Sequence, residues 1–465
     1  MHPNDTIAAI STSIGEAGIG IVRMSGQDAL RIADEVFLAK DGRKPPHFKT
    51  YTLHYGWIVA QPAKERGPSA GVVDEVVLTV MRAPKSYTRE DVVEINCHGG
   101  IAALRKVLDL VLGRGCRLAE PGEFTKRAFL NGRIDLAQAE AVIDIIRAKS
   151  DAAFKIGAEQ LRGVLSTMIQ GMRGALLATL AQLEAQIDFP EEEIGPADKE
   201  RITQDLQRLN CSLKALIESS RYGRLVREGI HVVICGSPNV GKSSLLNALL
   251  RQERSIVTAV PGTTRDTIEE IIDIRGIPIR IVDTAGILGP RDLIEKEAVA
   301  RSKRQIDLAD LVILLFDGSR ALTRQDKMLA SRLKNRPVLA VVNKIDKKQR
   351  IEKSAVPKYC KSTVLISAKK NRNIDLLEDA IARLVYGGEV SSAASVLAAN
   401  VRQTQLIKKA QKLIAEAIDS VDNKLSLEFV AQGARDALAC LDELVGARFS
   451  EEVLDRIFSE FCIGK

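Results

Sequence analysis

The sequence predicts a multidomain protein: an N-terminal α+β domain, an all-α helical domain, and an α/β domain inserted into the helical one. Three observations favour this fold class. The chain has 465 residues, and about 150 residues per domain would give three domains. Its 45% apolar and 27% charged residues are typical of globular chains rather than disordered ones. Two helical stretches flank a region in which strands and helices alternate.

Residues 1–120 mix short β-rich runs with helical patterns. Residues 19–23, 76–80 and 92–95 are expected to form strands. A helix is expected after residue 100, with one apolar face made by Ile101, Leu104, Val107 and Leu108. This mixture predicts an α+β domain.

Apolar residues then recur at steps of three and four from Leu161 to Ile187, and Pro190 with a run of glutamates is expected to end that helix. A second helical block carries two apolar stripes, made by Leu406, Ala410, Leu413 and Ala417 and by Leu427, Val430, Ala434, Leu438, Leu441 and Val445. Because each block leaves an apolar stripe to be covered, we infer that the blocks pack on each other. The alternating region between them predicts a parallel α/β sheet. The expected domain boundaries are 1–120, 121–220, 221–388 and 389–465.

Charge and cysteine content exclude several classes of protein. Lys and Arg number 67 against 60 Asp and Glu, and the resulting +7 permits nucleic acid binding without requiring it. The 4% aromatic content disfavours a large RNA-reading surface of stacked rings. Seven scattered cysteines without a CxxC pair favour a reducing compartment, the cytoplasm, over a disulfide framework or a zinc knuckle. We see no signal core, leader or long apolar run, and therefore expect no membrane span.

Residues 236–243 read GSPNVGKS, a complete GxxxxGK[ST] motif between a strand pattern at 230–235 and a helix pattern. Glycines let backbone N–H groups curl around phosphate oxygens, and the helix N-terminus adds positive potential. Lys242 would neutralise the outer phosphates, and the Ser243 hydroxyl would bind Mg²⁺. A glycine-rich turn without a ligand is the alternative, which this context disfavours.

Three later motifs point to a guanine nucleotide: DTAG at 283–286, NKID at 343–346 and SAK at 367–369. Asp283 can hold a metal ion through water. Asp346 can accept two N–H bonds from guanine, whereas adenine lacks the amino donor and would leave buried acceptors unpaired. Asn343 would tie the base-binding loop to the P-loop. Together these motifs predict a GTP site in a Ras-like P-loop GTPase domain.

The residues after the P-loop offer a candidate switch segment and two candidates for the group that orients water. Residues 261–266 offer a threonine that would complete Mg²⁺ coordination, so 255–270 is a candidate switch segment, with an ordinary loop as the alternative. Many GTPases orient water with a Gln directly after the DTAG glycine, but here that residue is Ile287. Glu295 and Glu297 are both candidates, and physical reasoning does not choose between them or exclude a solvated acidic helix start.

Further motifs run along the whole chain: DTIAA at 5–9, GIGIVR at 18–23, SYT at 86–88, EDVVE at 90–94, PGEFTKRAFLNG at 121–132 and FCIGK at 461–465. With them the chain resembles the MnmE (TrmE) family of tRNA modification GTPases. The resemblance implies a homodimer that joins the FAD flavoprotein MnmG in a heterotetramer. That complex uses GTP to add a carboxymethylaminomethyl-type group to carbon 5 of the wobble uridine of certain tRNAs. It also implies that 1–120 binds a tetrahydrofolate derivative (5-formyl- or methylene-tetrahydrofolate) and dimerises.

The resemblance assigns roles to individual residues. Potassium-dependent dimerisation of G domains would use Asn239, Thr258, Val260 and Thr263 as K⁺ ligands, while Ser243 and Thr264 would bind Mg²⁺. Glu295 matches the water-orienting glutamate. The expected nucleotide contacts are Asn239, Val240, Gly241, Lys242, Ser243, Ser244, Thr258, Thr263, Thr264, Asp283, Thr284, Ala285, Gly286, Asn343, Lys344, Asp346, Ser367, Ala368 and Lys369.

The folate positions of the family match Arg23, Glu94, Arg133 and Lys465. Cations suit the glutamate tail of folate and a carboxylate suits the donors of the pterin edge; surface charge is the alternative for the two arginines. Cys462 is either a redox or nucleophilic group or a small residue packed in a cleft.

The chain departs from the family at Leu288, where Arg is common, and at Glu16, where a basic run is common. Two other functions compete. A ribosome-assembly GTPase switch would usually carry a basic RNA-binding appendage, which we do not see. A folate-dependent aminomethyl transferase with a vestigial G domain is disfavoured by the intact P-loop and NKID motif.

Overall fold

The computed structural model describes residues 5–60, 71–189, 196–252, 269–283, 305–351, 356–357, 360, 362–386, 399–423 and 425–465. The chain divides into two compact units. The first comprises Met1–Ile143, Ser166–Arg173 and Ala439–Lys465, and the second comprises Asp144–Leu165 and Gly174–Leu438.

A seven-stranded sheet in the order β3-β4-β5-β6-β2-β1-β7 forms the centre of the first unit. Adjacent strands in this sheet are antiparallel, except that β1 and β7 are parallel. The strands are β1 (Ile7–Ile10), β2 (Gly20–Ser25), β3 (Phe37–Ala39), β4 (Thr52–Val59), β5 (Val72–Met81), β6 (Val92–Cys97) and β7 (Arg117–Leu118). The strands predicted at 19–23, 76–80 and 92–95 are confirmed within β2, β5 and β6, except that Ile19 lies ahead of β2 and is exposed.

Helices α1 (Ala29–Val36) and α2 (Ile101–Leu112) share one apolar core with this sheet, and a single-turn helix, η1 (Pro45–His47), precedes β4. On α2 the predicted face is confirmed at Leu104 and Val107, which are buried, whereas Ile101 in the first turn is exposed. A second core in this unit joins α3 (Glu123–Leu130), α4 (Leu136–Arg147) and α14 (Glu451–Ser459). The end of the chain therefore packs on helices that follow the N-terminal sheet.

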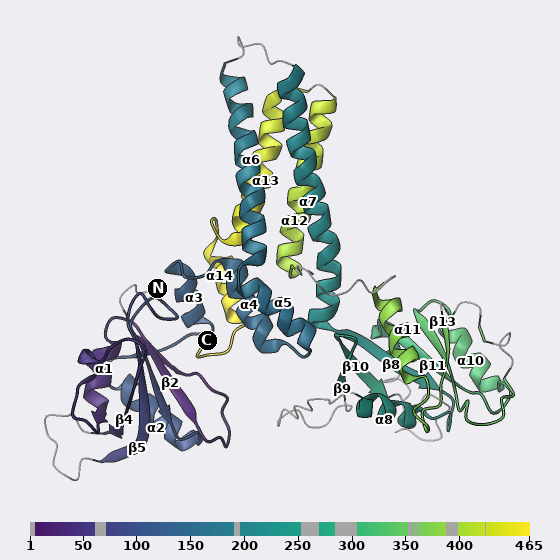
Figure 1. Ribbon diagram of the computed structural model, residues 1–465, viewed down its shortest axis with the longest axis horizontal. Coiled ribbons are helices and arrows are strands. Elements are labelled where there is room, and N and C mark those ends of the chain that lie inside the picture. The colour runs from purple at the N-terminus through teal and green to yellow at the C-terminus, as the bar shows by residue number, and fades with distance from the viewer. Residues whose placement is uncertain are drawn as a thin grey trace. The chain divides into compact units, whose positions relative to one another are not determined.

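The second unit contains long helices from two distant parts of the sequence: α5 (Asp151–Leu161), α6 (Val164–Asp188), α7 (Pro196–Glu228), α12 (Val401–Asp422) and α13 (Leu427–Val445), of which α6 and α13 extend into the first unit. Helices α7 and α12 lie side by side (Figure 1), with a 2.9 Å hydrogen bond from Gln411 to Asn210. Glu184 of α6 accepts a 3.0 Å bond from Arg435 of α13. The two helical blocks thus contact each other.

Two details of the predicted helices are wrong. The helix predicted to run through Leu161 is two helices, because α5 ends there and Gly163 takes a left-handed φ of +87° before α6 begins. On α12 the predicted stripe is confirmed at Ala410 and Ala417, which are buried, whereas Leu406 and Leu413 are only half-buried. The neighbouring Ile407 and Ile414 are buried in addition.

The expectation that no segment is apolar enough to cross a membrane is also corrected. Helix α6 is long and apolar enough by length and composition alone. Its buried side chains recur at three- and four-residue steps at Leu165, Ile169, Met172, Leu176, Leu180 and Leu183. Such a stripe is the pattern of a helix that packs one face against other helices.

A six-stranded sheet in the order β13-β12-β11-β8-β10-β9 also belongs to the second unit. It is parallel apart from the β9–β10 hairpin. Its strands are β8 (Ile230–Gly236), β9 (Glu269–Ile274), β10 (Ile277–Asp283), β11 (Leu311–Asp317), β12 (Val338–Asn343) and β13 (Ser362–Leu365), with helices α8 (Lys242–Gln252), α10 (Arg324–Arg332) and α11 (Ile374–Tyr386). The parallel strands end at one edge, which is where ligands bind in such sheets.

Candidate functional site

The loop between β8 and α8 is the predicted P-loop. It bends through two left-handed residues, Asn239 (φ +61°) and Gly241 (φ +101°). A Cβ at Gly241 would lie 2.4 Å from the side-chain amide nitrogen of Asn343, so only glycine fits. Lys242 begins α8, and its ammonium donates to the carbonyl oxygens of Gly236 and Ser237, at 3.0 and 3.3 Å. The ammonium and the helix N-terminus make this loop favourable for an anion.

Asn343, at the end of β12, joins three loops of the site. Its Nδ2 donates to the carbonyl oxygen of Val240 in the P-loop at 2.9 Å. Its Oδ1 accepts from the backbone N–H of Ala368 at 3.0 Å and of Lys344 at 2.8 Å. The structure thereby brings together the P-loop, the NKID loop and the SAK loop.

Asp346 of the NKID loop is exposed, and its Oδ1 accepts a 2.5 Å hydrogen bond from the Ser367 hydroxyl. That hydrogen bond holds the pKa of the Asp346 carboxyl below its ordinary value. At neutral pH the side chain is therefore an ionised acceptor, fixed at one oxygen and accessible to a ligand. Lys369 follows in the same loop and is exposed.

The residues on either side of Pro238 in the P-loop are joined by a closed chain of polar contacts. We call it the P-loop ring, and its members are Ser237, Asn239, Lys344, Asp317, Arg320 and Asp326. The Ser237 hydroxyl donates to Asp326 Oδ1 at 2.5 Å. Lys344 Nζ donates to the Asn239 carbonyl oxygen at 2.7 Å and to Asp317 Oδ2 at 2.6 Å. Arg320 closes the ring, 3.0 Å from Asp326 Oδ2 and 4.0 Å from Asp317 Oδ2.

Both carboxylates of the ring are ionised at neutral pH. Burial raises the pKa of Asp317, but hydrogen bonds from Lys344 and Ser319 outweigh it and bring that pKa below its ordinary value. Burial likewise raises the pKa of Asp326, and hydrogen bonds from Ser237 and Thr323 lower it further than burial raises it.

Part of the predicted site lies outside the described residues. Asp283 ends β10, whose backbone pairs with β8 next to the P-loop. Ser243 and Ser244 lie in the first turn of α8. The predicted residues outside the described ranges are Thr258, Val260, Thr263, Thr264, Thr284, Ala285, Gly286 and Glu295, together with Glu297. Within the described ranges no cluster of three or more His, Cys, Asp or Glu could hold a metal ion.

The residues predicted for folate come together in the first unit. Arg23 of β2 and Glu94 of β6 are paired across neighbouring strands, with 2.7 Å between Nη2 and Oε1. The Arg23 guanidinium lies 5.6 Å from the centre of the Phe124 ring and 5.9 Å from that of Tyr87. Arg133 lies over the same Tyr87 ring at 4.7 Å. Two cations and a carboxylate around aromatic rings suit a planar ligand with an anionic tail.

The segment 461–465 lies against these residues. Arg23 Nη1 is 3.5 Å from the Gly464 carbonyl oxygen, and the backbone N–H of Phe124 donates to the Lys465 carbonyl oxygen at 3.1 Å. Gly464 has φ +94°, and a Cβ there would lie 2.3 Å from the carbonyl oxygen of Ile10. Glycine is therefore required for the segment to reach this place. Cys462 is exposed, so the interpretation as a residue packed in a cleft is wrong.

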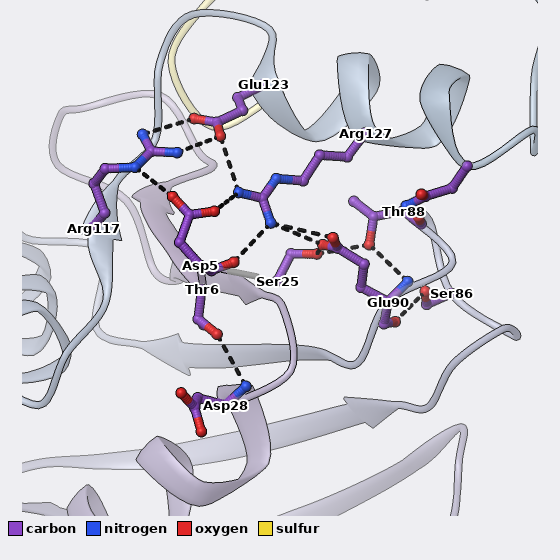
Figure 2. Close-up of polar contacts among 11 residues, drawn as sticks. Asp5, Thr6, Ser25, Asp28, Ser86, Thr88, Glu90, Arg117, Glu123 and Arg127 are labelled. Carbon is purple, nitrogen blue, oxygen red and sulfur yellow. Dashed lines mark hydrogen bonds and ion pairs between the residues drawn. The ribbon is translucent and has the colours of Figure 1, made fainter. Parts of the chain in front are cut away.

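An ionic network centred on the buried Glu123 and Arg127 lies beside these residues and was not predicted from the sequence (Figure 2). We call it the Arg127 network, and its members are Asp5, Glu90, Arg117, Glu123 and Arg127. Arg127 donates to Glu123 at 3.0 Å, to the Asp5 carboxylate at 2.5 Å and to Glu90 at 3.2 Å. Arg117 contacts Asp5 and Glu123 as well, at 2.7 and 2.5 Å. The signal in the sequence was that four of these charges, Asp5, Glu90, Glu123 and Arg127, fall inside the motifs at 5–9, 90–94 and 121–132, whereas Arg117 lies outside them.

The network sets the charge state of its carboxylates. Burial raises the pKa of Glu123, but hydrogen bonds from Arg117, the Glu120 amide and Arg127 outweigh it, so the pKa lies below its ordinary value. The pKa of Asp5 is also lowered, because hydrogen bonds from Arg117 and Arg127 exceed the opposing effect of burial. Both groups are ionised at neutral pH and are held by arginine.

Comparison with known proteins covers the whole chain. Residues 6–133 match the family model described as the GTP-binding protein TrmE N-terminus, and residues 136–462 match the MnmE helical domain. The chain is 43% identical over 467 residues to the tRNA modification GTPase MnmE of Alkaliphilus oremlandii, covering all of both chains. It is 44% identical over 465 residues to the protein of that name in Geobacillus thermodenitrificans, covering 99% of each.

Two solved structures match part of the chain. The G domain of the FeoB iron transporter of T. maritima is 28% identical, with a TM-score of 0.26, and covers 33% of this chain and 98% of that one. A variant of Era from Aquifex aeolicus bound to GDP and AlF4⁻ is 28% identical, with a TM-score of 0.27, and covers 40% of this chain and 66% of that one. The family assignment rests on the full-length relatives and the two family models, which show that this chain belongs to the MnmE family of tRNA modification GTPases.

Proposed function

We propose that this chain hydrolyses GTP and, with a flavoprotein partner of the MnmG type, adds a carboxymethylaminomethyl-type group to carbon 5 of the wobble uridine of certain tRNAs. Membership of the MnmE family supports the reaction class. The observation that carries the nucleotide assignment is the side chain of Asn343, which bonds both the P-loop and the SAK loop. A phosphate-binding loop and a base-binding loop then belong to one site.

Guanine is the base that this site suits. Asp346 is ionised and exposed, with Ser367 holding one of its oxygens. A carboxylate accepts hydrogen bonds from both the ring N–H and the amino group of guanine. Adenine presents no such pair of donors at this edge, so ATP would leave the acceptors without partners.

Magnesium and potassium ions would be held by oxygen ligands around the P-loop. Ser243 supplies a hydroxyl at the first turn of α8, and we assign Mg²⁺ to Ser243 and Thr264. Asn239 is exposed, and its side-chain amide has no hydrogen bond to any described residue. We assign K⁺ to Asn239, Thr258, Val260 and Thr263. Bound cations neutralise the charge that develops on the phosphate oxygens.

Hydrolysis requires a group that orients water, and we assign this role to Glu295. A carboxylate accepts a proton or a hydrogen bond from the attacking water, which Ile287 cannot do. The remaining predicted contacts, from Thr284 to Gly286 and at Lys369, are proposed to surround the phosphates and the base.

A tetrahydrofolate derivative, 5-formyl or methylene, is the proposed ligand of Arg23, Glu94, Arg133 and Lys465. Glu94 offers acceptors to the pterin donors, and the cations suit the glutamate tail. The pairing of Arg23 with Glu94 and the closeness of segment 461–465 support one shared site. Cys462, which is exposed in that segment, is available for redox or nucleophilic chemistry.

We further propose a homodimer formed through residues 1–120, with G domains at 221–388 between helical parts at 121–220 and 389–465. Leu53 of β4 is 68% exposed and Tyr55 is 42% exposed, and such apolar groups favour cover by a partner chain. All seven cysteines lie in described residues and are free thiols, which supports a cytoplasmic, reducing location.

Two measurements test this function. Mass analysis of tRNA nucleosides from cells lacking the protein should show loss of the wobble-uridine group, as should cells lacking the flavoprotein; unaltered anticodon nucleosides would overturn the proposal. The purified chain should hydrolyse GTP in preference to ATP, and much faster in K⁺ than in Na⁺. Equal rates in the two salts would remove Asn239 from the metal role without touching the nucleotide assignment.

A further inference from the structure

Asp326 uses its two carboxylate oxygens for two different elements. Oδ2 accepts from the backbone N–H and the hydroxyl of Thr323, at 2.9 and 2.7 Å, and so completes the capping box of α10. Oδ1 accepts from the Ser237 hydroxyl at 2.5 Å. Both Asp326 and Ser237 are 2% exposed. The helix cap needs only the bonds to Oδ2. The bond from Ser237 to Oδ1 is not part of the cap and instead connects Asp326 to the P-loop.

The bond to Ser237 fixes the P-loop just before its exposed part. Pro238 and Asn239 are exposed, and Asn239 keeps a left-handed φ of +61°. Most residues other than glycine pay roughly 1–2 kcal/mol for this conformation, asparagine less than most, and contacts with the surroundings help to hold it. Asp326 holds the loop on one side of Pro238, and Lys344 holds the Asn239 carbonyl on the other.

The charges of the P-loop ring balance. Asp317 and Asp326 are ionised carboxylates, and Arg320 and Lys344 are cations. The ring therefore stabilises the loop without adding net negative charge beside a phosphate site. Arg320 connects the two carboxylates, so the contact at Ser237 and the contact at Asn239 belong to one network.

We propose that Asp326 is a positioning residue for nucleotide binding: it holds Ser237 directly and Asn239 through Arg320, Asp317 and Lys344, so that the P-loop has its ligand-binding shape before the nucleotide arrives. A preformed loop loses less conformational freedom on binding and therefore binds more tightly. This inference rests on the proposed binding of guanine nucleotide to the loop.

The test uses the full-length chain and a fluorescent GDP analogue, with the dissociation constant and the melting temperature measured for each variant. Ser237→Ala removes only the hydroxyl, and Asp326→Asn weakens both sets of bonds. Thr323→Ala is the matched control, because it removes the helix cap but leaves Ser237 and Asp326 Oδ1 in place. A double variant, Ser237→Ala with Asp326→Asn, completes a cycle.

Ser237→Ala and Asp326→Asn should each raise the dissociation constant of the GDP analogue by about tenfold, which is the usual effect of losing a hydrogen bond to a charged group. The double variant should bind the analogue no more weakly than Asp326→Asn does. Thr323→Ala should melt at a lower temperature but keep the wild-type dissociation constant. Unchanged affinity in Ser237→Ala, or equal losses in Ser237→Ala and Thr323→Ala, would overturn the positioning role even if Asp326→Asn fails to fold.

A K⁺ titration of GTP hydrolysis separates this inference from the proposed function. If the P-loop ring holds Asn239 in position to bind K⁺, Ser237→Ala should raise the K⁺ concentration that gives the half-maximal rate. A wild-type chain that works equally in Na⁺ would count against the proposed K⁺ site alone, since the affinity cycle still tests the ring. A wild-type chain that does not bind the GDP analogue would overturn both.

Discussion

Arg127 and Glu123, one turn apart on α3, form an ion pair in which the side chains are 8% and 1% exposed and Nη2 lies 3.0 Å from Oε1. The pair also contacts Asp5, which precedes β1, and Arg117 of β7. The network therefore fastens helix α3 to the edge of the sheet. Two arginines face three carboxylates in this network. Because Arg127 is itself buried, the loss of Glu123 removes a partner from a buried charge.

Glu123→Gln should lower the free energy of unfolding by about 3 kcal/mol, because removing one partner of a buried ion pair is strongly destabilising. Urea unfolding of the full-length chain measures this, followed by a probe in the first unit. Asp28→Asn is the control: its pair with Arg31 is 52% exposed on both sides, and exposed pairs contribute less than about 1 kcal/mol. Similar losses in both variants would show that the Arg127 network has no special role in stability.

The same network predicts a sensitivity to acid. The pKa values of Asp5 and Glu123 are lowered in the folded state. Their stabilisation is thus fully present above the unfolded-state pKa values, about 4, and is lost as pH falls through the folded-state values. Wild-type stability should fall on acidification below about pH 4.5, and it should fall less steeply in Glu123→Gln. An unchanged slope in that variant would place the acid-sensitive groups elsewhere.

Local patterns were sufficient to predict the P-loop and the strands at 19–23, 76–80, 92–95 and 230–235, because their signals lie within a few neighbouring residues. The motif at 236–243 and the strand before it need no distant partner to be identified. The burial of α12 shows where local patterns fail. Leu406 and Ile407 are adjacent and both apolar, as are Leu413 and Ile414, so periodicity alone does not decide which of each pair faces the core.

The Arg127 network could not be predicted from the sequence for a different reason, the large separation of its members along the chain. Arg127 pairs with Asp5 across 122 positions of sequence, and Arg23 lies near Gly464 across 441. The charges have no spacing that marks them as partners, and most Asp, Glu and Arg side chains are solvated. Only the folded sheet brings β1, β7 and α3 together. Sequence resemblance identified Arg23, Glu94, Arg133 and Lys465 as a group, whereas residue chemistry alone favoured surface charge for the two arginines.

Gly464→Ala should displace segment 461–465 and weaken binding of a tetrahydrofolate analogue by more than about tenfold. The new Cβ would lie 2.3 Å from the carbonyl oxygen of Ile10, in addition to the strained φ of +94°. Gly42→Ala is the matched control, because Gly42 has φ +73° with no atom within 4 Å of the added Cβ. Isothermal titration calorimetry measures both. Equal affinity in the two variants would separate the segment from the folate site.

Glu295→Ala should keep GTP affinity but lose most turnover, by about 100-fold or more if the carboxylate acts on the attacking water. Single-turnover hydrolysis with saturating GTP measures the chemical step directly. Glu297→Ala is the control, since Glu297 is the other carboxylate in the same segment. If Glu297→Ala loses turnover and Glu295→Ala does not, the two assignments must be exchanged.

Asp346→Asn should weaken GTP binding by about 100-fold, because an amide offers one acceptor where the carboxylate offers two and places its NH₂ group against a guanine donor. Xanthine carries an oxygen in place of the guanine amino group, so XTP should bind Asp346→Asn better than GTP does. Ser367→Ala is a milder variant for comparison, because it removes the 2.5 Å bond that fixes Asp346 but keeps the carboxylate. Its affinity for GTP should fall by only about tenfold, and its affinity for XTP should not rise. Competition of GTP, ATP and XTP against a fluorescent GDP analogue measures the wild type and both variants in one assay. If Asp346→Asn keeps its preference for GTP, then guanine is selected by groups other than the NKID carboxylate, and the backbone N–H groups of the SAK loop become the next candidates.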